Sequence, residues 1–568
     1  MKTIIESALH SAVETLNSTE NFNIPSEKIA LSIERTRDVA HGDFASNLAM
    51  MLARDLKKSP RQIADMLIAA LPSNPMIESV TVAGAGFMNF TLAKQAYFNE
   101  LNEVHAKADR YGHNTIGQGD KVQVEFVSAN PTGPLHVGHG RGAAVGDSLA
   151  RIMAANGYEV TKEFYYNDAG AQIDNLTLSV KARIDGQTPE DESWPADGYR
   201  GDYIMDIAND FLAKKTVQAD DRSIVATGDK EDLANIREFA VAYLRHEQDL
   251  DLKAFDVNFD VFFLESSLYK DGSVEKTVTE LTNNGFTYEQ DGALWLRTTD
   301  FGDDKDRVMR KKEGGYTYFV PDVAYHRNKW ERGFKRVVNE QGADHHGTIA
   351  RVRAGLQALE IGVPKGWPDY VLHQMVLVMR DGQEVKISKR AGSYVTLRDL
   401  IDEVGKDATR YFLVARKPDS QLQFDIDLAR SQSSENPVYY IQYAHARICS
   451  LLDERSKQQA FDANSAKAHV DRLDTELDYE LMRVISRFPE MVISANNNNA
   501  PHLIAAYLQE LAGAVHSYYN AKDEEGKAIR ILTDDQALQD AKLYLLSSAK
   551  QVIANGLHLL GLTAPHKM

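Results

Sequence analysis

The spacing of apolar and polar residues divides the chain into three stretches of different character. In residues 1–112, an apolar stripe at helical spacing across residues 44–52 is followed by a glycine-punctuated strand pattern at 82–92, which predicts a small α/β module. Residues 113–430 alternate β-branched runs with helical patterns. In residues 431–568 the strand signals largely stop, and apolar residues recur every three or four positions, as in a helix bundle. The pattern predicts a multidomain α/β protein with an all-α carboxyl-terminal domain.

A strand, a helix and a second strand follow one another early in the middle stretch. The β-branched run Val122–Val127 predicts the first strand, residues 142–157 have helical spacing, and Glu159–Tyr166 predicts the second strand. The turn between the first strand and the helix, residues 128–141, reads SANPTGPLHVGHGR. Because such units build parallel sheets, we expect a Rossmann-like catalytic domain with this turn at the carboxyl edge of the sheet.

The turn contains two histidines, His136 and His139, near the expected amide end of the helix. The helix dipole favours an anion there, imidazoles that are charged or donate hydrogen bonds would add to it, and Gly138 lets a phosphate or a flat ring approach the backbone. The motif therefore predicts a nucleotide-phosphate site. Zinc ligation, or capping and packing, are the alternatives for such a pair. With a single cysteine, Cys449, and no adjoining HxxxH or CxxC, we expect no zinc and no other resident metal.

The fragment EFVSANPTGPLHVGHGRG resembles the HIGH region of class I aminoacyl-tRNA synthetases and, over its full length, that of the arginyl-tRNA synthetase family. The second class signature, KMSKS, is matched by VKISKRAGSYVTL, where Lys386, Ser388 and Lys389 are in register and Arg390 replaces the last serine. Expulsion of pyrophosphate from ATP builds negative charge on the leaving group, which lysines on a closing loop would stabilise. A solvated basic turn is the alternative for this segment alone.

The resemblance implies a set of site residues. It assigns catalysis to His136, His139, Lys386 and Lys389, ATP binding to Gly138, Asp344, His345, His346 and Ser388, and arginine binding to Glu125, Ser128, Asn130, Tyr318 and Asp322. Two acids, a tyrosine and an amide suit a guanidinium ligand. Alternatives remain open: Glu125 could pair with a nearby arginine, Asp322 could be an ordinary N-cap, and Asp344 with the adjacent histidines could form a metal site.

The negative charge of the chain is concentrated in one segment. The whole chain carries −18, and residues 174–306 hold 30 acidic and 14 basic residues, a net charge of −16. Because this segment lies between the two signatures, we expect an insertion in the catalytic domain. An acidic face on it would restrict a polyanionic partner to the other surfaces of the protein. A solvated face tuned for solubility is an equal alternative.

The two terminal stretches resemble the tRNA-binding domains of the family. Residues 1–112 resemble the amino-terminal additional domain, with Arg35 and Asn47 as candidate RNA contacts, and residues 431–568 resemble the helical anticodon-binding domain. Candidates there for stacking on bases or binding phosphates are Tyr439, Tyr440, Tyr443 and Arg447. Core packing is the alternative for the tyrosines, and a solvated or structural role is the alternative for Arg35 and Asn47.

Composition adds the cellular setting. The 568 residues are 43% hydrophobic and 26% charged, without the pattern of a membrane span or a secretory signal, and a single cysteine fits the reducing cytoplasm. The resemblance implies a monomeric enzyme that uses ATP with Mg²⁺ to activate L-arginine, generally with tRNA bound, and transfers it to the terminal 2′-hydroxyl of tRNA(Arg). A synthetase for glutamate or cysteine, and a catalytically silent RNA-binding scaffold, are the competing interpretations. The acidic pocket, the single cysteine and the two intact signatures argue against them.

Overall fold

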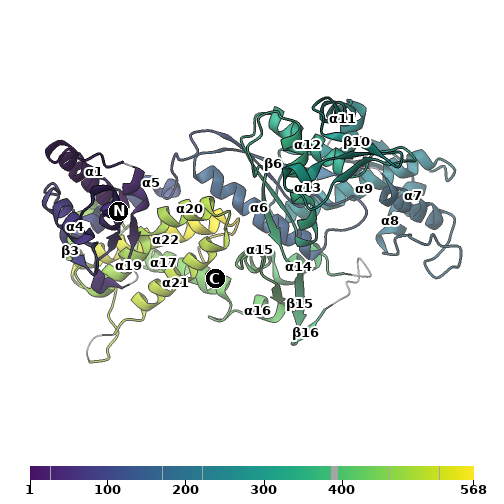
Figure 1. The fold of residues 1–568 in the computed structure, drawn as a ribbon. Coiled ribbons are helices and arrows are strands. Elements are labelled where there is room, and N and C mark those ends of the chain that lie inside the picture. The colour runs from purple at the N-terminus through teal and green to yellow at the C-terminus, as the bar shows by residue number, and fades with distance from the viewer. Residues whose placement is uncertain are drawn as a thin grey trace.

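The computed structural model describes residues 1–25, 27–36, 38–168, 170–219, 222–385, 394–457, 459–522 and 525–568. A parallel sheet lies in the middle of an elongated molecule (Figure 1). The amino-terminal module and the carboxyl-terminal helices lie together at one end, and the helices of the acidic segment lie at the other. The predicted fold class, an α/β catalytic domain with a small α/β amino-terminal domain and a helical carboxyl-terminal domain, is confirmed.

The amino-terminal module packs helices against an antiparallel sheet of strand order β1-β2-β4-β3. Its elements are α1 (Lys2–Thr19), α2 (Glu27–Leu31), β1 (Ile33–Arg35), β2 (Phe44–Ser46), α3 (Leu48–Leu56), α4 (Pro60–Ala69), β3 (Ile77–Ala83), β4 (Phe87–Leu92) and α5 (Lys94–Lys107). The helical stripe predicted over residues 44–52 is wrong at its start, because Phe44 lies on β2 opposite Phe90 and the helix begins at Leu48. A short buried strand followed directly by a helix reproduces the apolar spacing of one longer helix.

The central sheet is parallel, with strand order β14-β13-β5-β6-β9. Its strands are β5 (Lys121–Glu125), β6 (Glu159–Tyr166), β9 (Val261–Leu264), β13 (Arg336–Gly342) and β14 (Asp369–His373). From β5 the chain proceeds outward to β6, and from β13 it proceeds outward to β14 on the other side. The crevice between β5 and β13 is therefore the point where the strand order reverses, which is where open α/β sheets bind ligands.

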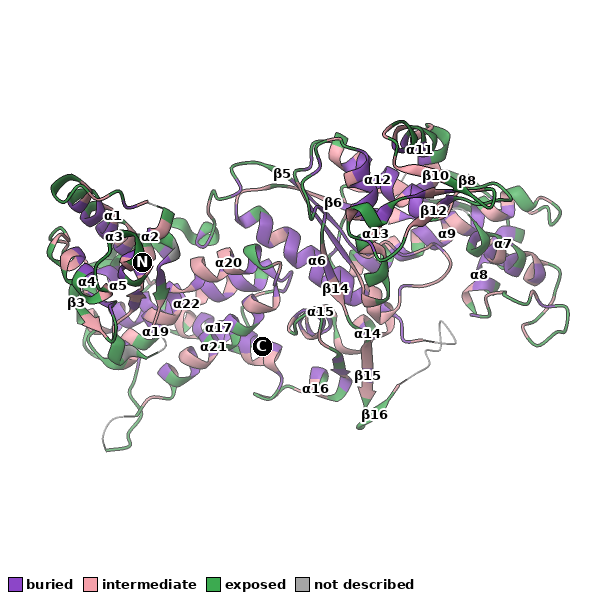
Figure 2. Ribbon diagram, in the orientation of Figure 1, coloured by how far each residue is buried: buried purple, intermediate pink, exposed green. Residues whose placement is uncertain are grey.

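Helices cover both faces of this sheet. Helix α6 (Val137–Ala155) packs on the face that holds Val122, Val124 and Val338, while α12 (Phe319–Glu331) and α13 (His346–Ala358) share a core with Val337 on the other face. Figure 2 shows α6 as mostly buried, and β5 and β13, in the middle of the sheet, are more buried than the edge strands β9 and β14. Helix α6 begins at Val137 rather than at the predicted residue 142, so the HVGH motif forms its first turn.

The acidic segment is not one continuous insertion. The predicted stretch 174–306 is interrupted by β9, which returns to the central sheet beside β6. The part before β9 has its own core and comprises α7 (Ala171–Ile184), α8 (Tyr203–Leu212), β7 (Thr216–Gln218), β8 (Ser223–Val225) and α9 (Leu233–Ala254). The part after β9 comprises α10 (Glu265–Lys270), α11 (Ser273–Asn283), β10 (Thr287–Gln290), β11 (Ala293–Leu296) and β12 (Arg307–Arg310).

The chain after β14 leads from a small sheet into the carboxyl-terminal helices. The first part holds β15 (Val376–Arg380), β16 (Gln383–Glu384), α14 (Leu397–Val404), α15 (Lys406–Val414), β17 (Leu422–Asp425) and α16 (Ile426–Arg430). The helical domain holds α17 (Pro437–Ser456), α18 (Ala463–Ala466), α19 (Glu476–Ser486), α20 (Phe488–Asn497), α21 (His502–Tyr519) and α22 (Gln536–Leu559). One hydrophobic core runs from the amino-terminal module through this helical domain to α6.

Candidate active site

The first turn of α6 holds His136 and His139 in a reciprocal arrangement. The amide of His139 donates to Nδ1 of His136 over 3.2 Å, and the amide of His136 donates to Nδ1 of His139 over 3.3 Å. Burial lowers the pKa of His136 to about 4 and holds the pKa of His139 well below its usual value. Because Nδ1 accepts, each neutral ring carries its proton on Nε2. The sequence left open whether the imidazoles are charged or are neutral hydrogen-bond donors. The geometry indicates two neutral donors.

Glycines bring other groups close to this turn. A Cβ atom on Gly138 would lie 2.8 Å from the ring of His136, so this glycine makes room for the histidine itself. A Cβ atom on Gly142 would lie 2.5 Å from Glu340. Glu340 lies at the end of β13, and its Oε1 is 2.5 Å from Nδ1 of His373, at the end of β14. Burial opposes the charge on His373, but the Glu340 carboxylate outweighs it and raises the pKa of His373.

A cleft opens beside the HVGH turn. It has a volume of about 520 Å³. It is lined by Asn130, Thr132, Gly133, Pro134, His136, His139, Gln172, Tyr199, Arg200, Gly201, Tyr203 and Tyr394. Its floor is the loop that joins β5 to α6, and neighbouring elements hold this loop in place: Tyr203 donates to the carbonyl of Thr132 over 2.9 Å, and Gln248 on α9 donates to the carbonyls of Asn130 and Gly133.

The segment that resembles KMSKS ends at this turn. Lys386, Ser388 and Lys389 lie outside the described residues. The chain resumes at Tyr394, whose hydroxyl donates to the carbonyl of Pro134 over 2.9 Å. The amide of Val137 then donates to Val395, and the amide of Leu397 donates to Leu135. The residues that follow the segment are thus bound to the loop that carries the histidines.

The carboxylate of Glu125, at the end of β5, is already paired. Its Oε2 accepts from Nζ of the buried Lys329 on α12, and its Oε1 accepts from Oγ of Ser128 over 2.9 Å. Ser128 Oγ also accepts from the amide of Tyr165 over 3.2 Å. The structure thus matches the alternative in which Glu125 pairs with a basic residue, with a lysine in place of an arginine. Both oxygens of Glu125 therefore bind protein groups at the carboxyl end of β5.

Asp322 and Tyr318 lie at the start of α12. Tyr318 is the residue before the helix and is 71% exposed. Asp322 lies in the first turn, and its side chain does not cap the helix, so its interpretation as an ordinary N-cap is wrong. Burial, and then the carboxylates of Glu265 and Glu125, raise the pKa of Asp322 to about 7.

Sequence reasoning missed Glu265 and Gln341. Glu265 directly follows β9, accepts a 2.7 Å hydrogen bond from Tyr165 and has a pKa raised by burial. Gln341 lies near the end of β13, and within the described residues its buried Oε1 has no hydrogen-bond partner. Glu265 was hidden because it lies in the acidic segment assigned to an insertion. Recognition of the strand VFFL before Glu265 would have placed it at the carboxyl edge of the sheet.

The other predicted ligand residues surround the mouth of the crevice. Asp344 and His345 lie in the turn after β13, where their side chains are 82% and 57% exposed, and the exposed His346 opens α13. Asn130 lies on the cleft floor and donates to Gln172 over 2.5 Å. These residues line the same end of the sheet as the histidine pair, while Asp322 and Glu265 lie across the strand ends on the α12 side.

The aromatic candidates on α17 lie side by side. The rings of Tyr439 and Tyr443 stack with centroids 5.9 Å apart, and Tyr443 is 41% exposed. Tyr440 packs against His516, and Arg447 lies over the ring of Tyr519. Tyr443 therefore offers the most accessible ring of the group.

The two amino-terminal candidates, Arg35 and Asn47, are both half-buried but differ in their contacts. The Arg35 guanidinium donates to Glu490 and Ser486 of the helical domain and lies over Phe44. Arg35 therefore joins the amino-terminal module to the helical domain, which matches the structural role given above as the alternative to RNA contact. Asn47 lies half-buried before α3, and it makes no side-chain cap.

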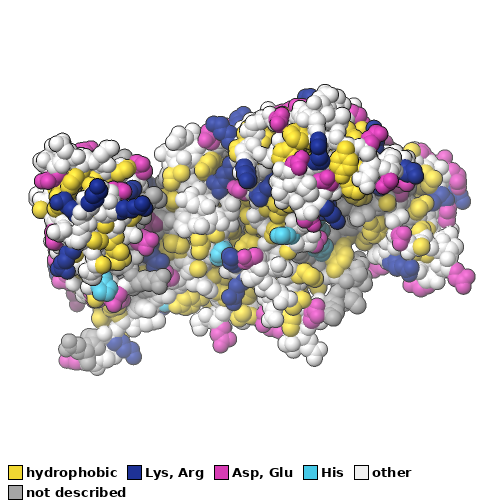
Figure 3. Space-filling view, in the orientation of Figure 1, with side chains coloured by type: hydrophobic (Ala, Val, Ile, Leu, Met, Phe, Trp, Pro, Cys, Tyr) yellow, Lys and Arg dark blue, Asp and Glu magenta, His cyan; other side chains and the backbone are white. Residues whose placement is uncertain are grey.

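The surface of the acidic segment is mixed. Figure 3 shows acidic and basic side chains interspersed over the face drawn, including the end formed by this segment. On that face the excess negative charge therefore forms no continuous acidic surface. Within the residues that the structure describes, no helix has the length and apolar character needed to cross a membrane.

Comparisons with known proteins match three successive stretches of the chain. Residues 1–92 match the arginyl tRNA synthetase N terminal domain, residues 100–436 match the class I (R) tRNA synthetase catalytic domain, and residues 441–568 match the DALR anticodon binding domain. The chain is 57% identical to the arginine–tRNA ligase of Geotalea daltonii and 58% identical to that of Geobacter metallireducens, over 95% of each chain. The Thermus thermophilus arginyl-tRNA synthetase has the same fold, with a TM-score of 0.76 at 23% identity over the full length of both chains. The chain belongs to the arginyl-tRNA synthetase family.

Proposed function

We propose that this crevice activates L-arginine with MgATP and transfers the arginyl group to the 2′-hydroxyl of the terminal adenosine of tRNA(Arg). One observation carries the choice of amino acid. Asp322 and Glu265 lie together at the carboxyl edge of the sheet, and the pKa of each carboxyl is raised in the ligand-free protein. A guanidinium would relieve both acids by pairing with them.

Neighbouring residues complete this pocket. The free acceptor of Gln341 and the exposed ring of Tyr318 give the guanidinium a neutral partner and a wall. For Glu125, expected from the sequence to bind arginine directly, we propose a positioning role, because Lys329 balances its charge and Ser128 donates to it. We assign Asn130, which lines the cleft, and Ser128, two residues before it, to the amino and carboxylate ends of the substrate.

The activation step takes place between the pocket and the HVGH turn. An oxygen of the arginine carboxylate attacks the α-phosphorus of ATP, and the bond from that phosphorus to the bridging oxygen of pyrophosphate breaks. The Nε2–H groups of His136 and His139 donate to phosphate oxygens, and His373, whose pKa the Glu340 carboxylate raises, lies near them. Lys386 and Lys389 neutralise the departing pyrophosphate, with Gly138, Ser388 and the turn at residues 344–346 holding the nucleotide.

The second step uses the same crevice. The 2′-hydroxyl of the tRNA attacks the carbonyl carbon of arginyl-adenylate, AMP leaves with the electron pair of the broken bond, and the hydroxyl proton passes to solvent. The protein forms no covalent bond with the substrate in either step. Catalysis rests on orientation and on donors placed for the developing negative charge.

The setting of the reaction follows from these substrates. We propose that tRNA(Arg) contacts the stacked Tyr439 and Tyr443, with Tyr440, Arg447 and Asn47 nearby, and that the protein acts as a monomer in the cytoplasm. Arginine activation proceeds with tRNA bound. The MgATP complex is the substrate form of the nucleotide, and its Mg²⁺ neutralises phosphate charge.

Charging of tRNA with each amino acid in turn tests this function. Arginine alone is incorporated, and incorporation of another amino acid would overturn the assignment of the pocket. Failure to charge tRNA with any amino acid, while tRNA still binds, would favour a silent RNA-binding protein instead. A paired ATP–pyrophosphate exchange assay checks the activation step, because exchange that is equally fast without tRNA contradicts the proposed order.

A further inference from the structure

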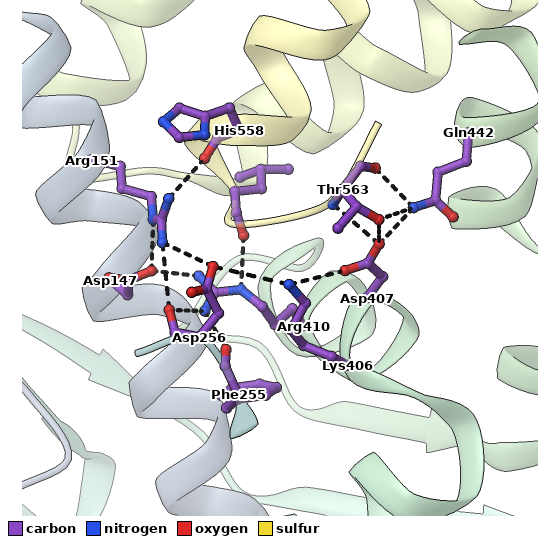
Figure 4. A network of polar contacts seen from close by, with 11 residues as sticks. Asp147, Arg151, Phe255, Asp256, Lys406, Asp407, Arg410, Gln442, His558 and Thr563 are labelled. Carbon is purple, nitrogen blue, oxygen red and sulfur yellow. Dashed lines mark hydrogen bonds and ion pairs between the residues drawn. The ribbon is translucent and has the colours of Figure 1, made fainter. Parts of the chain in front are cut away.

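Arg410 on α15 lies where three parts of the chain meet (Figure 4). Its side chain is fully buried, and its Nη2 lies 2.6 Å from Oδ2 of Asp147 on α6. Its Nε donates to the carbonyl of Leu560, just after α22, over 3.0 Å, and its Nη1 donates to the carbonyl of Phe255, just after α9, over 2.9 Å. One guanidinium thus joins the helix of the HVGH motif, the acidic segment and the carboxyl-terminal helical domain.

The first arm of this junction ends on the catalytic helix. Asp147 also accepts from Arg151 over 2.8 Å and lies 3.3 Å from Lys162. Burial alone would raise the pKa of Asp147, but Arg410 and these two cations outweigh it and lower that pKa. Asp147 therefore stays charged, and its position on α6 is fixed by the partners that surround it.

Helix α15 also rests on the first turn of α6. A Cβ atom on Gly140 would lie 2.9 Å from Leu397 on α14 and 3.4 Å from Leu413 on α15. Gly140 directly follows His139, so α15 contacts α6 both beside the histidine pair and at Asp147. A shift of α15 would therefore move the turn that carries the candidate catalytic donors.

The second arm is the end of the helical domain. A Cβ atom on Gly561 would lie 2.2 Å from Nη2 of Arg410, so the chain crosses directly over the guanidinium. Two residues later Thr563 donates its amide to Asp407 of α15 over 3.1 Å, and Gln442 of α17 donates to the same carboxylate over 2.7 Å. The residues after α22 and the helix α17 are thus both bound to α15.

The third arm reaches the cleft. Arg410 holds the carboxyl end of α9 through Phe255, and further back on this helix Gln248 donates to the carbonyls of Asn130 and Gly133. These carbonyls belong to the cleft floor. Arg410 is therefore connected to both sides of the candidate active site, through α6 and through α9.

We propose that Arg410 is a positioning residue that couples the docking of the anticodon-binding domain to the alignment of the HVGH turn and the cleft floor. The proposal rests on the proposed aminoacylation. A tRNA held by the helical domain raises kcat through this junction, in addition to lowering KM through direct contacts. Misplacement of catalytic groups by about 1 Å can cost roughly 10²-fold in rate, so a small shift at the junction is enough.

The test compares full-length tRNA(Arg) with the same tRNA lacking its anticodon arm. In the wild-type protein we expect loss of the anticodon arm of the tRNA to raise the KM for tRNA and to lower kcat by at least about tenfold. Arg410→Lys keeps the charge, but a single ammonium cannot span the three acceptors. In this variant we expect the kcat measured with full-length tRNA to fall to the kcat measured with the truncated tRNA. The difference in KM between the two RNAs should persist.

Gly561→Ala provides a second variant, which does not replace Arg410 itself. The new methyl group displaces the guanidinium, so we expect the same loss of the kcat difference. Gly186→Ala is the matched control, because Gly186 has a similarly positive φ of 85° but open space around its Cβ position. Arg472→Lys, at an exposed ion pair on the helical domain, controls for loss of an arginine.

The outcomes separate the two proposals. Failure of the wild-type protein to charge tRNA with arginine overturns the proposed function. Normal charging with a kcat that is equal for both RNAs in the wild type overturns the coupling. Coupling through Arg410 is also refuted if Gly561→Ala or Arg410→Lys keeps the wild-type ratio of kcat values. If Arg410→Lys does not fold, the comparison of Gly561→Ala with Gly186→Ala decides the matter.

Discussion

The rings of His136 and His139 stack with centroids 3.6 Å apart and planes inclined by 16°, and each ring accepts a hydrogen bond from the backbone of the other. Two protonated imidazoles at this separation would repel each other, and burial already lowers the pKa of both. The pair therefore consists of two neutral rings on a helix amino terminus, each with its Nε2–H left to donate. This arrangement explains why the motif needs histidines with a glycine between them.

Replacement of His136 separates its role as the N-cap of α6 from its proposed role as an Nε2–H donor. His136→Asn keeps a good N-cap but removes the Nε2–H donor, whereas His136→Ala removes both. We expect both variants to lose roughly 10²–10³-fold in kcat for arginine activation, as for removal of one oxyanion donor. Only His136→Ala should also lose about 1 kcal/mol of unfolding free energy. Pyrophosphate exchange and urea unfolding measure the two effects. Near-normal exchange by His136→Asn would show that the histidine serves only as a cap.

The raised pKa of Asp322 predicts that arginine binding depends on pH. Its pKa of about 7 lies above the value of 3.8 for an unperturbed aspartate, so the folded ligand-free protein keeps a proton that the unfolded chain loses at lower pH. The contribution of the Asp322 carboxyl to the free energy of unfolding therefore falls as pH rises from about 4 to about 7. Bound arginine favours the carboxylate, because its guanidinium pairs with it.

We therefore expect the KM for arginine to rise as pH falls from 8 to 6, and arginine to raise Tm more at pH 8 than at pH 6. Asp322→Asn should remove this pH dependence and raise KM throughout. Steady-state exchange and thermal unfolding with and without arginine measure these changes. An arginine KM that is flat across this range in the wild type would contradict a guanidinium partner with a pKa near 7.

Close packing of α6 on Phe126, the residue after β5, predicts a strong effect at Gly146. A Cβ atom there would lie 2.2 Å from the ring of Phe126, which is fully buried. Gly146→Ala should therefore lower the unfolding free energy by about 1–3 kcal/mol. Gly513→Ala in α21 is the matched control, since the nearest atom to its Cβ lies 3.8 Å away and alanine favours helix by up to about 1 kcal/mol. Urea titration measures both, and equal stability of the two variants would refute the packing argument.

Tyr443 offers an accessible stacking surface for an unpaired base. At about 1–3 kcal/mol per stacked base, Tyr443→Ala should raise the KM for tRNA(Arg) by roughly 5- to 150-fold, with kcat at saturating tRNA unchanged. Tyr443→Phe keeps the ring and should behave as the wild type. Aminoacylation kinetics over a range of tRNA concentrations measure this, and an unchanged KM in Tyr443→Ala would assign the ring to packing against Tyr439 and His516.

The local patterns were sufficient to place the histidine turn but not its surroundings. A β-branched run, a breaker-rich turn and a helical stripe predicted the strand end at which His136 lies. The position of Glu265 depends instead on β9, four residues that pair with β6 from about a hundred residues away in the chain. Such pairing has no local signal, and the surrounding negative charge favoured an insertion.

Ion-pair partners on distant elements also changed the interpretation of Glu125 and Arg35. Glu125 meets Lys329 across the space between β5 and α12, which spacing along the chain does not reveal. Arg35 meets Glu490 of the helical domain because a single core unites the two terminal domains. In both cases a charged residue that suited a ligand is satisfied by the fold.

Discrimination against citrulline, which replaces the guanidinium by a neutral urea of similar shape, tests most directly whether Asp322 and Glu265 together recognise the guanidinium of arginine. We predict that the wild-type protein prefers arginine by at least about 10²-fold in kcat/KM for pyrophosphate exchange, since loss of a buried charged pair costs about 3–5 kcal/mol. Glu265→Gln and Asp322→Asn should each reduce this ratio to within about tenfold of unity. If both variants keep the wild-type ratio of kcat/KM for arginine over citrulline, Asp322 and Glu265 do not recognise the guanidinium.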